Sequence, residues 1–483
     1  MDLLWVISFL VMYYIRPQEW LTLFSTIQFA RIVMIGAIIS LFFRRRGFQP
    51  GQLLRTPHDW MILLFYAWLC VSSATPFEVF KETYSLPLTY FIIVQTLTTL
   101  PRIKIFLGWW TFLIVAIALL ALLSEHGIDP LGSYDLTHGR MKGRLSLNLS
   151  IFKNPNALGH NVVPVIPMLY YFCIWRRLLF LKEIGYFCLL IPLYCIYLTV
   201  SKGAFLAGGA TILATCTFGR PKAVQIVIAC FAILVGSTAI YALPRMNELQ
   251  KAKTDDAIQG RIAAFKHGLL ILEQKTKGIG YRQWLNSFKA SHHYSKAAHS
   301  SYVQVAAELG YPGFFLLLGI LYCNLRTLIT ANASDDNEER IRRILFILVI
   351  TYMLSSWMVD LGYRPTFFMF TAATAAFHRH MLGLNPSEEE EDEFEIQPRL
   401  QPAWRARLLP QPAIEEAFAR AGAPAAVLTL ESGPGFVTRS EPEEEQSPRI
   451  AWSWNRIGII DIALISTFTY GMIRIWIYVL GQM

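Results

Sequence analysis

Long apolar runs alternate with short polar segments along the first 382 residues of the chain. A helix needs about 20 mostly apolar residues to cross the roughly 30 Å hydrocarbon core of a membrane. The apolar runs therefore predict about twelve membrane-spanning helices and an all-α polytopic membrane protein. The predicted spans are residues 2–15, 22–43, 59–75, 84–100, 105–124, 157–175, 183–200, 204–219, 223–243, 301–325, 342–360 and 365–381, with a thirteenth at 457–479.

The composition fits this class, since 54% of the residues are hydrophobic and only 16% are charged. The seven cysteines lie in or beside apolar runs and form no CxxC pair, which argues against a disulfide framework or a thiolate metal site. The N-terminus has neither a basic segment nor a small-residue cleavage site. We therefore expect the first apolar run to be a retained helix rather than a signal peptide.

Lys and Arg residues cluster between alternate pairs of predicted spans, and such clusters normally stay on the cytoplasmic side of a membrane. All of them fall on that side if the N-terminus is cytoplasmic. The clusters are Arg44 to Arg46, Arg102 with Lys104, Arg176 with Arg177, Arg220 with Lys222, and Arg340 with Arg342 and Arg343.

This topology leaves two substantial segments outside, at residues 125–156 and 244–300. The second segment carries ten Lys or Arg residues against four acids. A basic segment on the outer side breaks the usual charge bias, so we expect it to bind an anion. Its apolar spacing predicts a helix along the membrane surface that begins near Gly260 and stops at Gly278.

Four short motifs, in this order along the chain, resemble the bacterial O-antigen ligase and polymerase family. The resemblance covers roughly residues 1–382. Lys202 stands where the family usually has Arg, and the spacing from the arginine to the Asn-Pro-Asn segment is longer than usual, so Arg140 and Arg144 are both candidates for that position. The motifs are Lys153-Asn154-Pro155-Asn156-Ala157-Leu158-Gly159 with a preceding arginine, Thr199-Val200-Ser201-Lys202-Gly203-Ala204, Arg261 followed by Gly278-Ile279-Gly280, and His299-Ser300-Ser301-Tyr302 followed by Glu308-Leu309-Gly310-Tyr311-Pro312-Gly313.

The resemblance implies a GT-C type helical bundle over residues 1–382, with 244–300 as a large periplasmic loop. It also implies transfer of a glycan from undecaprenyl pyrophosphate to an acceptor hydroxyl, such as that of lipid A-core, at the periplasmic face of the bacterial inner membrane. An O-antigen or exopolysaccharide polymerase and a protein O-oligosaccharyltransferase stay open as alternatives. A transporter or flippase is the alternative from another class, and it fits less well because the charges gather at span ends.

A sugar pyrophosphate already carries a good leaving group, so its transfer needs cations on the diphosphate and a base for the acceptor hydroxyl. His299 is the candidate base because its ordinary pKa lies near neutrality, and Glu308 is its rival. A helix-capping histidine and cations that merely reach the interface are the alternative interpretations. The candidate cations are Arg140, Arg144, Lys202, Arg261, Arg282 and Arg364, and Asn154, Asn156 and Tyr302 are further candidate binding residues.

Neither a DxD pair nor a His and Asp cluster at metal spacing occurs in the segments expected outside, so we expect transfer without a metal or other cofactor. The expected partners are the lipid-linked glycan donor, a glycolipid or glycan acceptor and membrane lipids, with no nucleic acid. Asp360 and Arg364, four residues apart, are expected to form a structural ion pair.

The last hundred residues have a different composition. Residues 383–455 contain acidic runs and Pro-rich stretches, which favour a disordered cytoplasmic tail. Residues 456–483 are apolar enough to cross the membrane again, and an interfacial helix is the alternative.

Overall fold

The computed structural model describes residues 1–26, 28–43, 53–242, 256–384, 454 and 456–482. Every regular element in these ranges is helical, which confirms the predicted all-α fold. The elements are α1 (Asp2–Ile15), η1 (Pro17–Glu19), η2 (Thr22–Phe24), α2 (Phe29–Phe43), α3 (Pro57–Val71), α4 (Pro76–Thr83), α5 (Ser85–Thr96), α6 (Leu100–Ser124), α7 (Ser133–Asp135), η4 (Leu136–Arg140), α8 (Pro155–Val162), α9 (Val165–Leu169), η5 (Tyr170–Ile174), α10 (Leu179–Leu198), α11 (Lys202–Thr217), α12 (Lys222–Ala242), α13 (Asp256–Gln274), α14 (Trp284–His292), α15 (Ser301–Thr330), α16 (Asp336–Ser355), α17 (Pro365–Met381) and α20 (Ile459–Gln482).

Each of the thirteen predicted apolar runs coincides with one or more of these helices. Within the described ranges, five helical stretches are both long and apolar enough to cross a membrane, which supports a multi-pass membrane protein. The total of about twelve crossings stays a prediction. The five stretches are Leu100–Ser124, Pro155–Ile174, Leu179–Leu198, Ser301–Thr330 and Ile459–Gln482.

The run predicted at 157–175 is not one continuous α-helix. It divides into α8, α9 and the π-helical turn η5, and Pro164 stands at the junction between α8 and α9. A proline lacks the N–H that a helix interior needs, so a break at this point is expected. The sequence interpretation missed it because only the apolar length of the run was considered.

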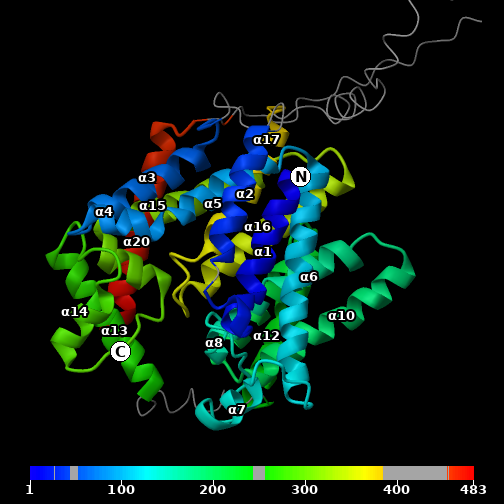
Figure 1. Cartoon of the computed structure of the whole chain (residues 1–483), viewed down its shortest axis with the longest axis horizontal. Helices are drawn as coiled ribbons and strands as arrows, with labels where there is room; N and C mark the ends of the chain where they lie inside the picture. The colour runs from blue at the N-terminus through cyan, green and yellow to red at the C-terminus, as the bar shows by residue number, and fades with distance from the viewer. Residues whose placement is uncertain (27, 44–52, 243–255, 385–453, 455, 483) are drawn as a thin grey trace, which may run out of the picture.

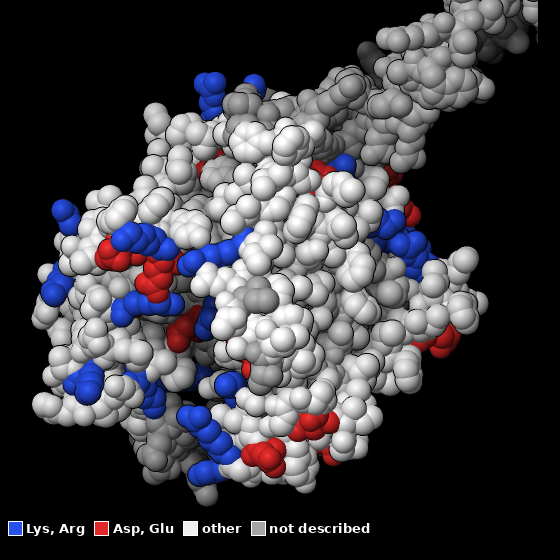
Figure 2. Space-filling view, in the orientation of Figure 1, with Lys and Arg blue, Asp and Glu red and all other residues white. Residues whose placement is uncertain are grey.

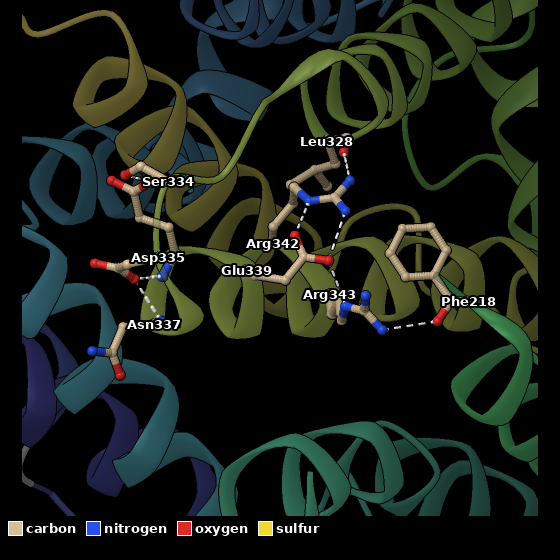
Figure 3. A network of polar contacts seen from close by, with 9 residues as sticks. Phe218, Leu328, Ser334, Asp335, Asn337, Glu339, Arg342 and Arg343 are labelled. Carbon is tan, nitrogen blue, oxygen red and sulfur yellow. Dashed lines mark hydrogen bonds and ion pairs between the residues drawn. The ribbon is translucent and has the colours of Figure 1, made fainter. Parts of the chain in front are cut away.

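One end of the bundle gathers most of the predicted basic clusters, and we call it the tail end because residues 384 and 454 flank the tail there. Glu339 accepts hydrogen bonds from Arg342 at 2.7 Å and from Arg343 at 2.6 Å (Figure 3). Arg343 also donates to the Phe218 carbonyl at 3.0 Å, which joins the end of α11 to the start of α16. Arg176 pairs with Asp336 at the same end. The clustering of these residues agrees with the charge pattern, while the cluster at 44–46 lies outside the described residues.

The opposite end carries α13 and α14, and we call it the insert end (Figure 1). The predicted surface helix is present as α13, which begins at Asp256 rather than near Gly260. Ala264 and Leu272 are buried on it, because α13 packs against α15 and α20. The first part of the predicted loop, residues 244–255, lies outside the described residues.

A sharp kink at Gly310 divides α15, where the backbone has φ 66° and ψ −164°. Such a conformation is open almost only to glycine. A Cβ atom at this position would lie 2.0 Å from the Thr276 carbonyl oxygen. The turn at Gly278 to Gly280 closes onto the kink, since Gly280 donates its N–H to the Glu308 carbonyl at 2.8 Å. The Gly-Ile-Gly segment is therefore a packed turn on α15, as the predicted helix stop requires.

The predicted C-terminal helix is present as α20, and it runs beside α15 from the tail end to the insert end (Figure 1). Asp461 in its first turn pairs with Arg326 near the end of α15. Trp476 in its last part contacts Phe265 on α13. The helix is long and apolar enough to cross a membrane, and the crossing itself stays a prediction. The prediction of disorder for the tail falls almost entirely on residues 385–453, outside the described part.

Candidate active site at the insert end

Several predicted site residues converge at the insert end, although the segments that carry them are far apart in the sequence. These segments are the starts of α8, α11 and α17, the first half of α13, the residue before the cap of α15, and the loop 356–364. Figure 2 shows a hollow on this face, between the part formed by α13 and α14 and the part formed by α1 and α2, with Lys and Arg side chains along it.

Arg144, rather than Arg140, contacts the Asn-Pro-Asn segment. Its Nη2 donates to Asn156 Oδ1 at 2.7 Å, and its Nε donates to the Thr199 carbonyl at 3.1 Å. Asn154 caps α8 by accepting the N–H of Asn156 at 2.9 Å, so its side chain has a helix-starting role. Arg140 ends η4 as an exposed side chain. Of the two candidate arginines, the geometry favours Arg144, and its role in binding stays a prediction.

Lys202 is the first residue of α11, and Ser201 before it caps the helix by accepting the N–H of Ala204. The next residue, Gly203, lies against two other segments of the site. A Cβ atom at Gly203 would be 2.9 Å from His160 Nε2 and 3.1 Å from Met358 Cβ. The turn that carries Lys202 is thus packed against both α8 and the loop 356–364.

Arg261 projects from α13 toward the loop 356–364. Its Nη1 lies 3.4 Å from the Met358 sulfur, and the side chain is half-buried. Its positive charge acts on both His299 and Asp360. A partly dry guanidinium in this position is well suited to a phosphate oxygen.

His299 immediately precedes the cap of α15 and has a left-handed backbone with φ 52°. A non-glycine residue rarely adopts this conformation, and such strain concentrates at functional sites. Burial, together with the charges of Arg261 and Lys296, lowers the pKa of His299 to about 4. The imidazole is therefore neutral near pH 7 and available to accept a proton.

The three residues after His299 form hydrogen bonds to the loop 356–364, through Ser300 and Ser301, and to the end of α16, through Tyr302. Tyr302 is 2% exposed, which indicates packing rather than substrate contact. The bonds run from Ser300 Oγ to the Ser356 carbonyl at 3.1 Å, from Ser301 Oγ to the Val359 carbonyl at 2.8 Å, from the Leu361 N–H to Ser301 Oγ at 2.7 Å, and from the Tyr302 hydroxyl to the Met353 carbonyl at 3.0 Å.

Asp360 lies on that loop beside Arg261 and Arg364. Its Oδ1 is buried without a hydrogen-bond partner among the described residues. Burial raises the pKa of this carboxyl to about 6, against the opposing effects of the Ser300 N–H, Arg364 and Arg261. Arg364 stands at the N-terminus of α17, close enough for its charge to act on Asp360, but no salt bridge joins these two described residues. The expected structural ion pair is thus wrong, and Arg364 acts on Asp360 only through its charge.

Glu308 belongs to a neighbouring cluster and is fully buried. Its Oε1 accepts the N–H of Trp284 at 3.1 Å, which fixes the start of α14. Oε2 has no hydrogen-bond partner within the described residues, although the Tyr363 phenol lies beside the carboxylate and has its pKa raised by burial and by that charge. Arg282 points away to pair with Glu82, and its side chain is 64% exposed. These positions favour structural roles for Glu308 and Arg282.

His160 is a site residue that the sequence interpretation did not single out. Its ring is buried on α8, and Nδ1 lies 3.1 Å from Ser355 Oγ. The positive charge of Arg261 acts on this ring. The available signal was its position four residues after Asn156, one helical turn further along the same face.

No group of three or more His, Cys, Asp or Glu side chains that could hold a metal ion occurs among the residues the structure describes. The described site consists of cations, the imidazoles of His160 and His299 and the carboxyl group of Asp360, at one end of a helical membrane bundle. That arrangement suits a membrane protein that handles an anionic ligand.

The comparison with known families agrees with this class. Residues 187–318 match the family model described as O-antigen ligase. The match confirms the predicted family resemblance, and it includes Lys202, Arg261 and His299. It supports a glycan-transferring membrane enzyme of the ligase or polymerase type. A search of curated proteins found no match.

Proposed function

We propose that this protein transfers a glycan from undecaprenyl pyrophosphate to an acceptor hydroxyl, at the periplasmic face of the bacterial inner membrane. The bundle would be of the GT-C type, with about twelve spans and the insert end facing the periplasm. The observation that carries the proposal is the convergence of Arg144, Lys202, Arg261 and Arg364 around His299 at one end of the bundle.

The cations would bind the donor diphosphate and stabilise its charge as the glycosidic bond breaks. Negative charge develops on the departing phosphate oxygen, so fixed cations favour the transition state more than the ground state. The charges of Arg261 and Arg364 both act on Asp360. Lys202, in place of the family's usual arginine, would contribute a point charge rather than a planar fork. Positive side chains therefore take the role that a divalent ion has in other transferases.

His299 would accept the proton of the acceptor hydroxyl as the new glycosidic bond forms. Its imidazole is neutral and lies next to Arg261, the group we assign to the phosphate. Asp360 is the second candidate, because it lies beside Arg261 and its Oδ1 is buried without a hydrogen-bond partner among the described residues. A carboxyl with a pKa of about 6 also serves as a base near neutral pH.

The identity of the acceptor distinguishes a ligase from a polymerase and from a protein O-oligosaccharyltransferase. We favour lipid A-core, the acceptor implied by the ligase resemblance, over a growing glycan or a protein hydroxyl. A transporter is less well supported, since the buried ion pair of Asp59 and Arg379 lies at the tail end rather than near the bilayer midplane. Deletion of the gene tests the choice by gel analysis of the surface glycolipid. Loss of long chains with accumulated lipid-linked polymer indicates a ligase, core with one repeat indicates a polymerase, and loss of only a glycoprotein band indicates protein glycosylation.

The test of the site uses purified full-length protein and a lipid-linked glycan donor. His299→Ala should lower transfer by about 10²-fold or more, the usual contribution of a general base, with unchanged abundance in membranes. His126→Ala, which removes an exposed histidine just after α6, is the matched control and should transfer like the wild type. Wild-type transfer by the His299 variant would exclude it as the base.

A further inference from the structure

The C-terminal helix α20 lies about 140 residues beyond the O-antigen ligase match, yet it is built into the body of the protein. Its first turn is fixed at the tail end through Asp461, which is 3% exposed. Asp461 accepts hydrogen bonds from the Tyr322 hydroxyl at 2.7 Å and from Trp454 Nε1 at 3.1 Å, and it pairs with Arg326. Removing either member of such a buried pair is costly, so α20 is held at one depth and one rotation.

One face of α20 packs along α15 and the other is exposed and apolar. The buried residues recur at helical spacing, which is the pattern of a helix with one protein-facing side. Gly319 on α15 faces this side of α20, since a Cβ atom there would lie 3.7 Å from Ile465 Cδ1, an ordinary van der Waals distance. The buried residues are Asp461, Ile465, Thr469, Ile473, Trp476 and Leu480.

At the insert end, Trp476 supports α13 directly. Its ring meets Phe265 edge to face at 6.3 Å between centroids. It also lies against Gly268, where a Cβ atom would come within 3.3 Å of the indole. Trp476 is 4% exposed, so its contact with α13 is dry. Edge-to-face aromatic pairs of this kind favour one relative placement of the two helices.

The contact continues from α13 to the loop of the site. The ring centroids of Phe265 and Trp357 are 6.5 Å apart, and those of Trp357 and Tyr302, in the His299 motif, are 4.9 Å apart. Arg261 precedes Phe265 by one helical turn, on the same face of α13, and touches Met358, the neighbour of Trp357. The side of α13 that carries Arg261 is therefore fixed between the loop 356–364 and α20.

We propose that Trp476 is a positioning residue for Arg261, so that α20 is a working part of the transfer site. This inference rests on the proposed function. Trp476 touches no reacting atom; it acts by holding α13 at the distance from the loop that places the guanidinium beside His299. A misplacement of about 1 Å at a catalytic group lowers rates by as much as 10²-fold, so a local loss of support has a large effect.

The experiment compares three variants of the full-length protein in proteoliposomes. Trp476→Ala should lower kcat for glycan transfer by roughly 10-fold to 10²-fold, and Trp476→Phe should retain most of the activity because an aromatic ring still meets Phe265. Tyr478→Ala removes a similar ring from the exposed face of α20, where the side chain is 67% exposed, and should behave like the wild type. Equal activity of Trp476→Ala and Tyr478→Ala overturns the proposal.

A second measurement does not depend on transfer. Hydrogen–deuterium exchange of the backbone of α13 should be faster in Trp476→Ala than in Tyr478→Ala, because the helix loses its support on one side. His299→Ala should leave this exchange unchanged. If the wild type transfers no glycan, the proposed function fails while a difference in exchange still demonstrates the support. If transfer is present and the exchange of α13 is the same in both variants, the positioning role is wrong.

Discussion

The pH dependence of transfer distinguishes His299 from Asp360, because their environments separate the pKa values of the two groups. Burial and two neighbouring cations lower the pKa of His299 to about 4, whereas burial raises that of Asp360 to about 6. A base works only when deprotonated. At pH 5 a base with a pKa of about 4 is roughly nine-tenths deprotonated, and one with a pKa of about 6 is roughly one-tenth deprotonated. The deprotonated fractions under the two assignments therefore differ by about tenfold at pH 5.

Single-turnover transfer in proteoliposomes, with donor and acceptor in excess over their binding constants, measures the rate at pH 5 and at pH 7. With His299 as the base, we expect the rate at pH 5 to be close to the rate at pH 7 and to fall only toward pH 4. Lys296→Met removes one of the charges that lower the pKa of His299, so it should move this acidic limb to higher pH. A rate at pH 5 near one-tenth of that at pH 7, with a limb that Lys296→Met does not move, would refute the assignment and favour Asp360.

Three further perturbations test the fold, the donor contact and the absence of a metal requirement. Gly310→Ala places a Cβ atom 2.0 Å from the Thr276 carbonyl oxygen at a positive φ. We therefore expect the free energy of unfolding to fall by at least about 2 kcal/mol, with a lower Tm. Gly471→Ala, with open space around the new Cβ atom, should have little effect. Arg144→Lys cannot keep both hydrogen bonds of the guanidinium, so it should raise the KM for the donor by roughly tenfold. Arg140→Lys should leave this KM unchanged, and equal KM values for the two variants would contradict the role of Arg144. EDTA should leave transfer by the purified protein intact, and loss of activity that Mg²⁺ restores would refute metal-independent transfer.

The helices could be predicted from the sequence because each depends on local composition. The apolar runs fall on helices throughout the described residues, and the basic clusters at 176–177, 220–222 and 340–343 share one end. The break at Pro164 was missed since apolar length alone does not report where a backbone donor is lacking. The close packing of Gly278 against Gly310 was also beyond the sequence, because it depends on contacts between two distant segments.

The chemistry of the site could be predicted only in part. The motif order identified Arg261, Lys202 and His299 as candidates, and these three lie in the same neighbourhood of the structure. Asp360 was interpreted as half of an ion pair, because it stands four residues from Arg364 near the outer junction of two predicted spans. The structure places both residues around a loop and a helix start, where that spacing does not bring the charges together. Arg282 was included as a cation of the insert, but its pairing with Glu82 depends on α4, far away in the sequence.

The hydrogen bonds from Ser300 and Ser301 to the loop 356–364 have a consequence for the energetics of the reaction. They tie the backbone beside His299 to the backbone beside Asp360 before any ligand arrives. The candidate base and the carboxyl then need no relative reorganisation when the donor binds, and little of the binding free energy is consumed in ordering them. Evolution can accordingly change the surrounding surface to bind a different acceptor, while His299 and the Asp360 carboxyl group keep their relative geometry.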